Sequence, residues 1–187
     1  MDSKDSSKRI RLLEAANQLV HQQGYNQTTL ADIAQKADVP LGNVYYYYKT
    51  KENIGEGLIS YRTRYYQSLL SEWEKSPDPK KRILSLIEEV ARQREVLACS
   101  GCPIGSLCQE LHKEGGPLAD KAAALLAYIL SWLEQQFRLA GKKSASADYA
   151  LHLLSALQGA SLLTHAFNQP DLVVRETARL KKWVKTL

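Results

Sequence analysis

Hydrophobic positions recur along this chain with a period near 3.6 residues, and the alternating pattern of a half-buried strand is almost absent. Residues 7–23 show the helical period clearly, with Ile10, Leu13 and Ala16 on one face. Gly24 ends this stretch because glycine adopts the left-handed conformation at little cost. The pattern predicts an all-α protein of about nine helices.

Glycines, prolines and capping residues set the boundaries of the other helices. Thr29-x-x-Asp32 has the spacing of a capping box, and Asp78 followed by Pro79 is typical of a helix start. The expected helices cover residues 29–37, 41–48, 50–75, 79–98, 106–113, 117–140, 146–167 and 171–187. We predict a DNA-binding domain over residues 1–50 and an effector-binding and dimerisation domain over residues 51–187.

Two short helices joined by a turn of about four residues are the signature of a helix-turn-helix. At roughly 100° per residue, Val44 and Tyr48 share one face of the second helix, which should pack inward together with Val39. The opposite face is more polar, and Tyr45 flanks the two faces. This opposite face comprises Gly42, Asn43, Tyr46 and Tyr47.

The polar face suits contact with double-stranded DNA. Asparagine can pair with adenine, tyrosine hydroxyls can donate to phosphate oxygens, and Lys49 and Lys51 follow where a phosphate strand would pass. The alternative is that the four consecutive tyrosines belong to the core. Because residues 100° apart cannot all point inward, at most two of them can do so.

The segment from Thr28 to Asn53, TTLADIAQKADVPLGNVYYYYKTKEN, resembles the TetR family of bacterial regulators, and its end, GNVYYYYKTK, looks much like the multidrug-responsive QacR branch. The resemblance implies an N-terminal three-helix helix-turn-helix and a C-terminal helical domain that binds ligand and dimerises. It also implies contacts to bases or the adjoining backbone from Leu41, Gly42, Asn43, Tyr45 and Tyr46, to phosphates from Tyr47 and Lys51, and to the DNA backbone from Thr28 or Thr29.

Two residues depart from the usual family pattern. Asp38 stands in the turn where the family often has glycine, although aspartate tolerates the left-handed region better than most residues. Leu41 replaces a commonly polar residue, so it can touch a thymine methyl group or turn inward, but it cannot hydrogen-bond a base edge.

Reading two successive major grooves requires two copies of this motif about 34 Å apart, and therefore a homodimer. Spacings of four and three residues in the last two helices predict its interface, and the alternative is that the same residues form the core of one chain. The predicted interface residues are Leu153, Leu157, Ala160, Thr164, Val173, Thr177, Leu180, Val184 and Leu187.

The helices between the two ends should enclose the site of a small-molecule effector. Aromatic and histidine residues are candidate lining groups, although such residues are more often plain core. The candidates are Tyr65, Trp73, Tyr128, Trp132, His165 and Phe167.

Three cysteines, Cys99, Cys102 and Cys108, lie within ten residues of one another. The segment around Cys102 resembles a Gly-Cys segment in TetR members that sense electrophiles or oxidants, and its place near a helix N-terminus favours a reactive thiolate. Cys99 or Cys108 would then be the resolving thiol. The alternative is that these cysteines are buried as small hydrophobic side chains.

Composition changes this picture little. A net charge of +5, with 44% hydrophobic and 24% charged residues, suits a globular protein that binds a polyanion. We expect a cytoplasmic protein, since there is no N-terminal apolar run and no membrane-spanning length.

Other functional classes have weaker support. Cys108 and His112 lie one helical turn apart, as a thiol enzyme would need, and Cys102, Cys108 and His112 could ligate zinc but lack a fourth ligand. No catalytic, metal-binding or cofactor motif accompanies them. A helical ligand-binding protein that no longer binds DNA is the remaining alternative.

Overall fold

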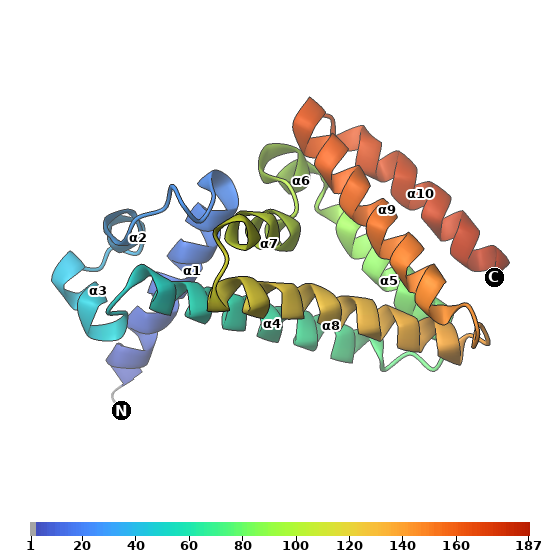
Figure 1. Cartoon of the computed structure of the whole chain (residues 1–187), viewed down its shortest axis with the longest axis horizontal. Helices are drawn as coiled ribbons and strands as arrows, with labels where there is room; N and C mark the ends of the chain where they lie inside the picture. The colour runs from blue at the N-terminus through green and yellow to red at the C-terminus, as the bar shows by residue number, and fades with distance from the viewer. Residues whose placement is uncertain (1–2) are drawn as a thin grey trace. The chain divides into compact units, whose positions relative to one another are not determined.

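The computed structural model describes residues 3–187, with side chains from Ser7 onward. These residues form ten α-helices and no strand, which confirms the all-α prediction (Figure 1). The helices are α1 (Ser3–Gln23), α2 (Leu30–Lys36), α3 (Leu41–Tyr47), α4 (Lys51–Trp73), α5 (Pro79–Arg92), α6 (Arg94–Ser100), α7 (Pro103–Glu114), α8 (Pro117–Leu139), α9 (Ser146–Phe167) and α10 (Pro170–Thr186). None of these described helices is both long and hydrophobic enough to cross a membrane.

Several helix boundaries differ from those predicted, and α1 begins at Ser3 instead of near Ser7. The helix expected over residues 79–98 is interrupted at Gln93, whose N–H is shared between the carbonyl oxygens of Glu89 and Val90. Helix α7 begins at Pro103, three residues earlier than expected. Proline is well suited to a first helical position, because the N–H that it lacks would have no partner there.

The chain divides into two compact units. The first comprises the described residues up to Tyr65 together with Ser106–Leu125, and the second comprises Tyr66–Gly105 and Leu126–Leu187. The divisions fall inside α4, α7 and α8, so these units do not coincide with the ranges 1–50 and 51–187. That functional division remains a prediction.

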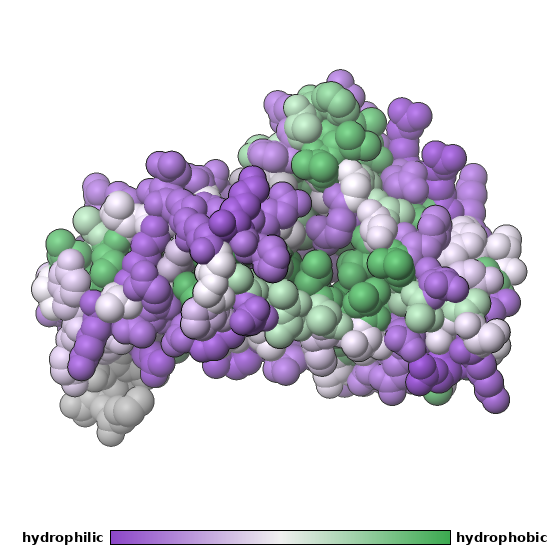
Figure 2. Space-filling view, viewed as in Figure 1, coloured by the Kyte–Doolittle hydropathy of each residue, from purple (hydrophilic) through white to green (hydrophobic). Residues whose placement is uncertain are grey.

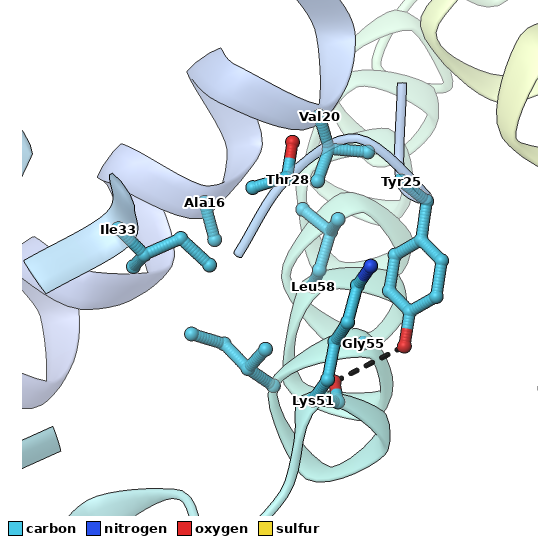
Figure 3. Close-up of a pocket in the computed structure, with 9 residues that line it drawn as sticks. Ala16, Val20, Tyr25, Thr28, Ile33, Lys51, Gly55 and Leu58 are labelled. Atoms are coloured by element: carbon cyan, nitrogen blue, oxygen red, sulfur yellow. Dashed lines mark hydrogen bonds between the residues drawn. The ribbon is translucent and has the colours of Figure 1, made fainter. Parts of the chain in front are cut away.

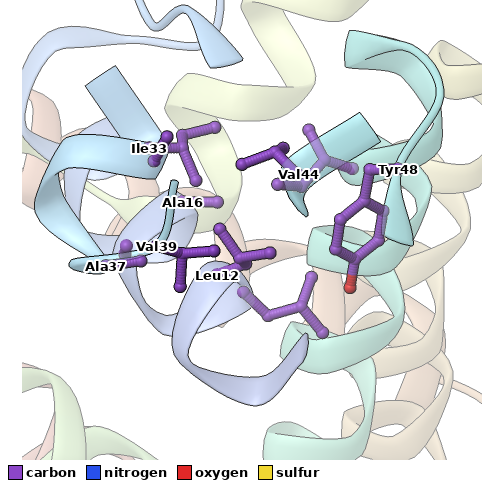
Figure 4. Close-up of a cluster of buried hydrophobic side chains, with 11 residues drawn as sticks. Leu12, Ala16, Ile33, Ala37, Val39, Val44 and Tyr48 are labelled. Carbon is purple, nitrogen blue, oxygen red and sulfur yellow. The ribbon is translucent and has the colours of Figure 1, made fainter. Parts of the chain in front are cut away.

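The first unit is built on a hydrophobic cluster that joins α1, α2, α3 and the start of α4. Leu12, Ile33 and Val44 are almost completely buried in it, and their side chains point toward one another in Figure 4. Full burial of a side chain of this size stabilises the fold by about 1.5–3 kcal/mol. A second cluster, which includes Leu58, Leu107 and Leu111, joins α4, α7 and the start of α8.

In the second unit, α10 packs against α9, α5 and α6, and α6 packs against α9. Figure 1 shows α9 and α10 lying side by side. Val173 on α10 and Ala160 on α9 are buried together with Leu97 on α6. This packing leaves the outer sides of α9 and α10 exposed.

Candidate functional site

Helix α2 begins with the predicted capping box. Asp32 N–H donates to Thr29 Oγ1 (3.1 Å), and Thr29 N–H donates in return to Asp32 Oδ2 (2.9 Å). The Thr29 hydroxyl also donates to Asp32 Oδ2, and these hydrogen bonds, the side-chain one first, lower the pKa of Asp32. The capping bonds satisfy amide groups that have no partner within the helix.

The turn between α2 and α3 depends on Asp38, which adopts the left-handed conformation at φ 50°, as expected for its place in the turn. Arg11 on α1 supports this turn, because Nη2 donates to the carbonyl oxygens of Ala37 and Asp38, the latter at 2.8 Å. The same atom lies 3.4 Å from Asp38 Oδ2. An arginine therefore stabilises the conformation that glycine would adopt more cheaply.

Helix α3 has one buried face and one exposed face. Val44 and Tyr48 are buried with Val39, which confirms the prediction from helical geometry. Tyr47 was predicted on the outward face but is partly buried against the same cluster, so two of the four tyrosines contact the core. The outward residues are Leu41, Gly42, Tyr45 and Tyr46, with Asn43 half-buried and Tyr46 the most exposed at 74%.

Thr28 does not fit the predicted DNA contact. It is only 1% exposed, and its hydroxyl donates to the carbonyl oxygen of Gly24 (2.7 Å). Its side chain therefore stabilises the turn before α2 and cannot reach DNA in this conformation. Thr29 is exposed and remains a candidate.

Lys51, a predicted phosphate contact, is held by the turn between α1 and α2. Its ammonium donates to the carbonyl oxygen of Asn26 (2.9 Å) and lies 4.7 Å from the centre of the Tyr25 ring. The Tyr25 hydroxyl donates to the carbonyl oxygen of Lys51 (3.1 Å), as the dashed line in Figure 3 shows. Burial, with the nearby carboxylates of Glu52, Glu114 and Glu110, raises the pKa of Tyr25 to about 12.

A hollow beside the exposed face contains basic residues that the sequence analysis did not single out. Arg9 on α1 and Arg64 on α4 line it together with Tyr46 and Tyr47. The guanidinium of Arg9 lies 6.0 Å from the centre of the Tyr48 ring. A basic residue on the first turns of α1 was the only sequence signal for this position.

The second unit contains a mostly hydrophobic cavity of about 560 Å³, including its open mouth. Trp73, Cys102, Glu89, Gln93 and Gln158 provide its polar or reactive groups. The remaining lining residues are Tyr66, Leu86, Val90, Leu97, Pro103, Ile104, Ile129, Leu154, Leu157 and Ser161. Hydrophobic walls with a few polar groups are typical of small-molecule sites.

Only two of the candidate effector residues line this cavity, Trp73 and Cys102. Trp132 is buried beside Trp73 and donates to Glu74 Oε1 (2.8 Å), and His165 Nδ1 lies 3.0 Å from the carbonyl oxygen of Ala98. The others among the predicted aromatic residues are exposed, namely Tyr65, Tyr128 and Phe167. Glu89 and Gln158 were missed because a polar residue inside a helical pattern does not reveal which cavity it faces.

The three cysteines lie in different surroundings. Cys102 Sγ accepts from Gly105 N–H (3.4 Å) and Gln158 Nε2 (3.5 Å). Cys99 is exposed on α6, whereas Cys108 donates to the carbonyl oxygen of Ala122 (3.2 Å). Within the residues that the structure describes, no three His, Cys, Asp or Glu side chains gather as a metal ion would require.

The residues predicted for the dimer interface are not exposed on the surface of a single chain. All but Leu187 are buried within a single chain, because the regularly spaced side chains of α9 and α10 pack inside the second unit: Leu153, Leu157, Ala160, Thr164, Val173, Thr177, Leu180 and Val184. Leu187, at the C-terminus, is half-buried. A spacing of four and three residues identifies a helix seam but does not tell which chain supplies the other helix.

The exposed sides of these helices are themselves hydrophobic. Leu151, Leu162, Leu163 and Phe167 are exposed on α9, and Figure 2 shows hydrophobic surface where α9 and α10 meet at the top of the view. A shallow groove between the helices contains Gly159, with a charged edge on α10. Its lining residues are Ala156, Gly159, Ala160, Leu163, Leu172, Arg175, Glu176 and Arg179.

Comparison with known proteins places residues 12–56 in a family model described as "Bacterial regulatory proteins, tetR family". The chain is 26% identical over 160 residues to the transcriptional regulator AcuR of Cereibacter sphaeroides, covering 83% of this chain and 69% of AcuR. It is 32% identical over 65 residues to QacR of Staphylococcus aureus, covering 35% of this chain and 33% of QacR.

Solved structures extend the similarity of the fold to nearly the whole chain. The crystal structure of the reduced form of NemR from E. coli superposes with a TM-score of 0.79 at 21% identity, covering 94% of this chain and 96% of NemR. At this identity, the likeness shows the fold alone.

Proposed function

We propose that this chain, whose residues 12–56 match the TetR family model, is a TetR-type regulator that binds operator DNA in the cytoplasm as a homodimer and is released by a small molecule. The single observation that carries the DNA-binding part is the division of α3 into two faces. Val44 and Tyr48 fix the helix to the core, while Tyr46 and its exposed neighbours are free to enter a major groove.

We assign base contacts to Leu41, Gly42, Asn43, Tyr45 and Tyr46, and phosphate contacts to Thr29, Tyr47 and Lys51. The exposure of Leu41 supports contact with a thymine methyl group. No atom of the described residues lies within 4 Å of a side-chain carbon built on Gly42, and this open space supports close approach of the helix to DNA. Arg9 adds a cation beside Tyr46, at the edge of the same surface.

In vitro selection from random DNA, followed by fluorescence anisotropy, tests this assignment. Tyr46→Ala should lose affinity for the selected DNA without losing stability, because its side chain is exposed. Tyr128→Ala is the matched control, since Tyr128 is an exposed tyrosine of the second unit. Wild-type affinity in Tyr46→Ala would refute the assignment.

We propose the outer sides of α9 and α10 as the dimer interface, with a second copy of this chain as the occupant. Under a two-fold axis, each groove would meet the same groove of the partner, so that Glu176 can face the arginines Arg175 and Arg179 across it. Gly159 supports close helix approach, because no described atom lies within 4 Å of a side chain built there.

We propose the cavity of the second unit as the effector site. Its walls favour a mainly hydrophobic molecule, and Glu89 supplies a carboxylate that already accepts from Gln93 Nε2 (2.7 Å) and pairs with Arg92. Ligand binding should change the fluorescence of Trp73, and Ser161→Phe should fill the cavity. If a compound that releases wild-type protein from DNA also releases Ser161→Phe equally, the cavity is not its site.

Modification of Cys102 is a second candidate signal, favoured because this thiol lines the cavity and accepts two hydrogen bonds. In alkylation by N-ethylmaleimide, the thiolate sulfur adds to the maleimide double bond and the other alkene carbon takes up a proton. This treatment should release wild-type protein and Cys99→Ser from DNA but not Cys102→Ser. Equal release of all three proteins would eliminate Cys102 as the sensor.

A further inference from the structure

Glu110 on α7 binds the turn that joins α1 to α2. Its two carboxylate oxygens accept from the consecutive backbone N–H groups of Tyr25 and Asn26, each at 2.7 Å. Consecutive N–H groups of this kind form a concave anion site. Gly24 permits the approach, because it adopts φ 89° and a side-chain carbon there would lie only 3.1 Å from both carboxylate oxygens.

The same turn fixes the position of Lys51. The carbonyl oxygen of Asn26 accepts from the Lys51 ammonium, and the Tyr25 ring lies beside it (Figure 3). Carboxylate, turn and ammonium therefore form one continuous set of contacts, and every member belongs to the first unit.

We propose that Glu110 is a positioning residue for DNA binding, which holds the turn so that Lys51 is directed at a phosphate. This inference rests on the proposed function, in which Lys51 contacts the DNA backbone.

A purely structural role for Glu110 makes a different prediction. Loss of a structural contact would lower the free energy of unfolding but would leave the number of DNA phosphates contacted by the folded protein unchanged. The salt dependence of DNA affinity separates the two roles, because each neutralised phosphate contributes about −0.9 to the slope of log affinity against log salt.

The experiment uses DNA selected by the wild-type protein and measures anisotropy over a salt series. Glu110→Gln replaces one of the two acceptor oxygens with an amide nitrogen, which cannot accept from a backbone N–H. It should weaken binding by up to about tenfold at 50 mM salt and make the slope shallower by up to about 0.9 for each subunit of the dimer. Lys51→Gln should lose a similar amount of DNA affinity and slope, and the double variant should lose no more of either than Lys51→Gln alone.

Glu114→Gln is the matched control, because it removes the same charge one helical turn further along α7. It should keep the wild-type slope. Glu110→Asp, which keeps the charge but withdraws the carboxylate by one methylene group, is the second variant if Glu110→Gln does not fold. It should shift affinity and slope in the same direction.

The outcomes separate the two proposals. Wild-type protein that selects no DNA refutes the proposed function, and this inference with it. A wild-type slope in Lys51→Gln refutes the phosphate contact of Lys51 and the inference that depends on it. If wild type and Lys51→Gln behave as proposed but the folded Glu110 variants retain wild-type affinity and slope, or if the two substitutions are additive, only the role of Glu110 is refuted.

Discussion

Removal of the Tyr48 hydroxyl should raise the stability of the fold, whereas removal of the Tyr46 hydroxyl should lower affinity for DNA. Tyr48 is 3% exposed, and within the described residues its hydroxyl has no hydrogen-bond partner. Its ring packs with Val44 in the core of the first unit (Figure 4). Tyr46 is exposed on the opposite face of α3, where we propose that its hydroxyl donates to DNA.

The size of each effect follows from these surroundings. Burial of an unpaired hydroxyl costs about 1–3 kcal/mol, so Tyr48→Phe, which keeps the ring, should raise the free energy of unfolding by about 1 kcal/mol. In a protein of this length, that corresponds to a rise in Tm of about 2–4 °C. Tyr46→Phe should leave stability within about 0.5 kcal/mol of wild type, because its hydroxyl is exposed. It should lose about two- to tenfold in DNA affinity, the value of one hydrogen bond.

Thermal melts and anisotropy with the selected DNA measure both quantities for both variants. Tyr48→Phe should retain wild-type affinity for DNA. A loss of about 1 kcal/mol or more in this variant would show that the Tyr48 hydroxyl has a stabilising partner, and would refute the reasoning. Wild-type affinity in Tyr46→Phe would remove the proposed hydrogen bond to DNA.

Three further predictions concern the interface and two titrating groups. Leu163→Arg should convert the dimer to a folded monomer in sedimentation, because Leu163 is exposed on the proposed interface. Leu153→Ala should instead lower the free energy of unfolding by about 2–5 kcal/mol, because Leu153 is buried in the core. A Leu163→Arg protein that remains dimeric would refute the revised interface. Because folding lowers the pKa of Asp32 below 3.8, its carboxylate should stabilise the fold above that pH, and this stabilisation should be lost as pH falls through the folded pKa. Asp32→Asn should remove this part of the dependence of unfolding free energy on pH. An unchanged pH dependence in Asp32→Asn would contradict the prediction. Because folding raises the pKa of Tyr25 from 10.0 to about 12, the stabilisation that its neutral hydroxyl gives the fold should be present below pH 10 and be lost as pH rises through about 12. Tyrosinate absorbance should show one late-titrating tyrosine that is missing in Tyr25→Phe. If that late titration persists in Tyr25→Phe, it belongs to another tyrosine.

The helix-turn-helix could be predicted because its signals are local. Helical geometry alone separates Val44 and Tyr48 from the outward residues, and the Thr29-x-x-Asp32 spacing alone indicates the capping box. The left-handed turn at Asp38 could also be expected. Its support by Arg11 could not, because that contact joins residues 27 positions apart.

The effector cavity and the interface depend on long-range packing, which periodicity does not reveal. Trp73 and Cys102 line the cavity, but Trp132 is buried elsewhere and Tyr128 is exposed, although all of them lie in helical patterns. Leu153, in the seam predicted for the interface, is buried within one chain, where α9 packs against α10. The interruption at Gln93 had no glycine or proline to indicate it.

Thr28 and Glu110 show the same limit at single residues. The sequence predicts that Thr29 caps α2, but it does not reveal that the Thr28 hydroxyl donates to the carbonyl oxygen of Gly24. Glu110 is one of many helical glutamates, and only the fold brings its carboxylate to the N–H groups of Tyr25 and Asn26.

Hydroxyl-radical footprinting of the selected DNA tests most directly whether two copies of α3 read successive major grooves. The account predicts two protected tracts centred one helical turn apart, about 34 Å, with both lost in Tyr46→Ala and both retained in Tyr128→Ala. A single protected tract, or a footprint that Tyr46→Ala leaves unchanged, would contradict it.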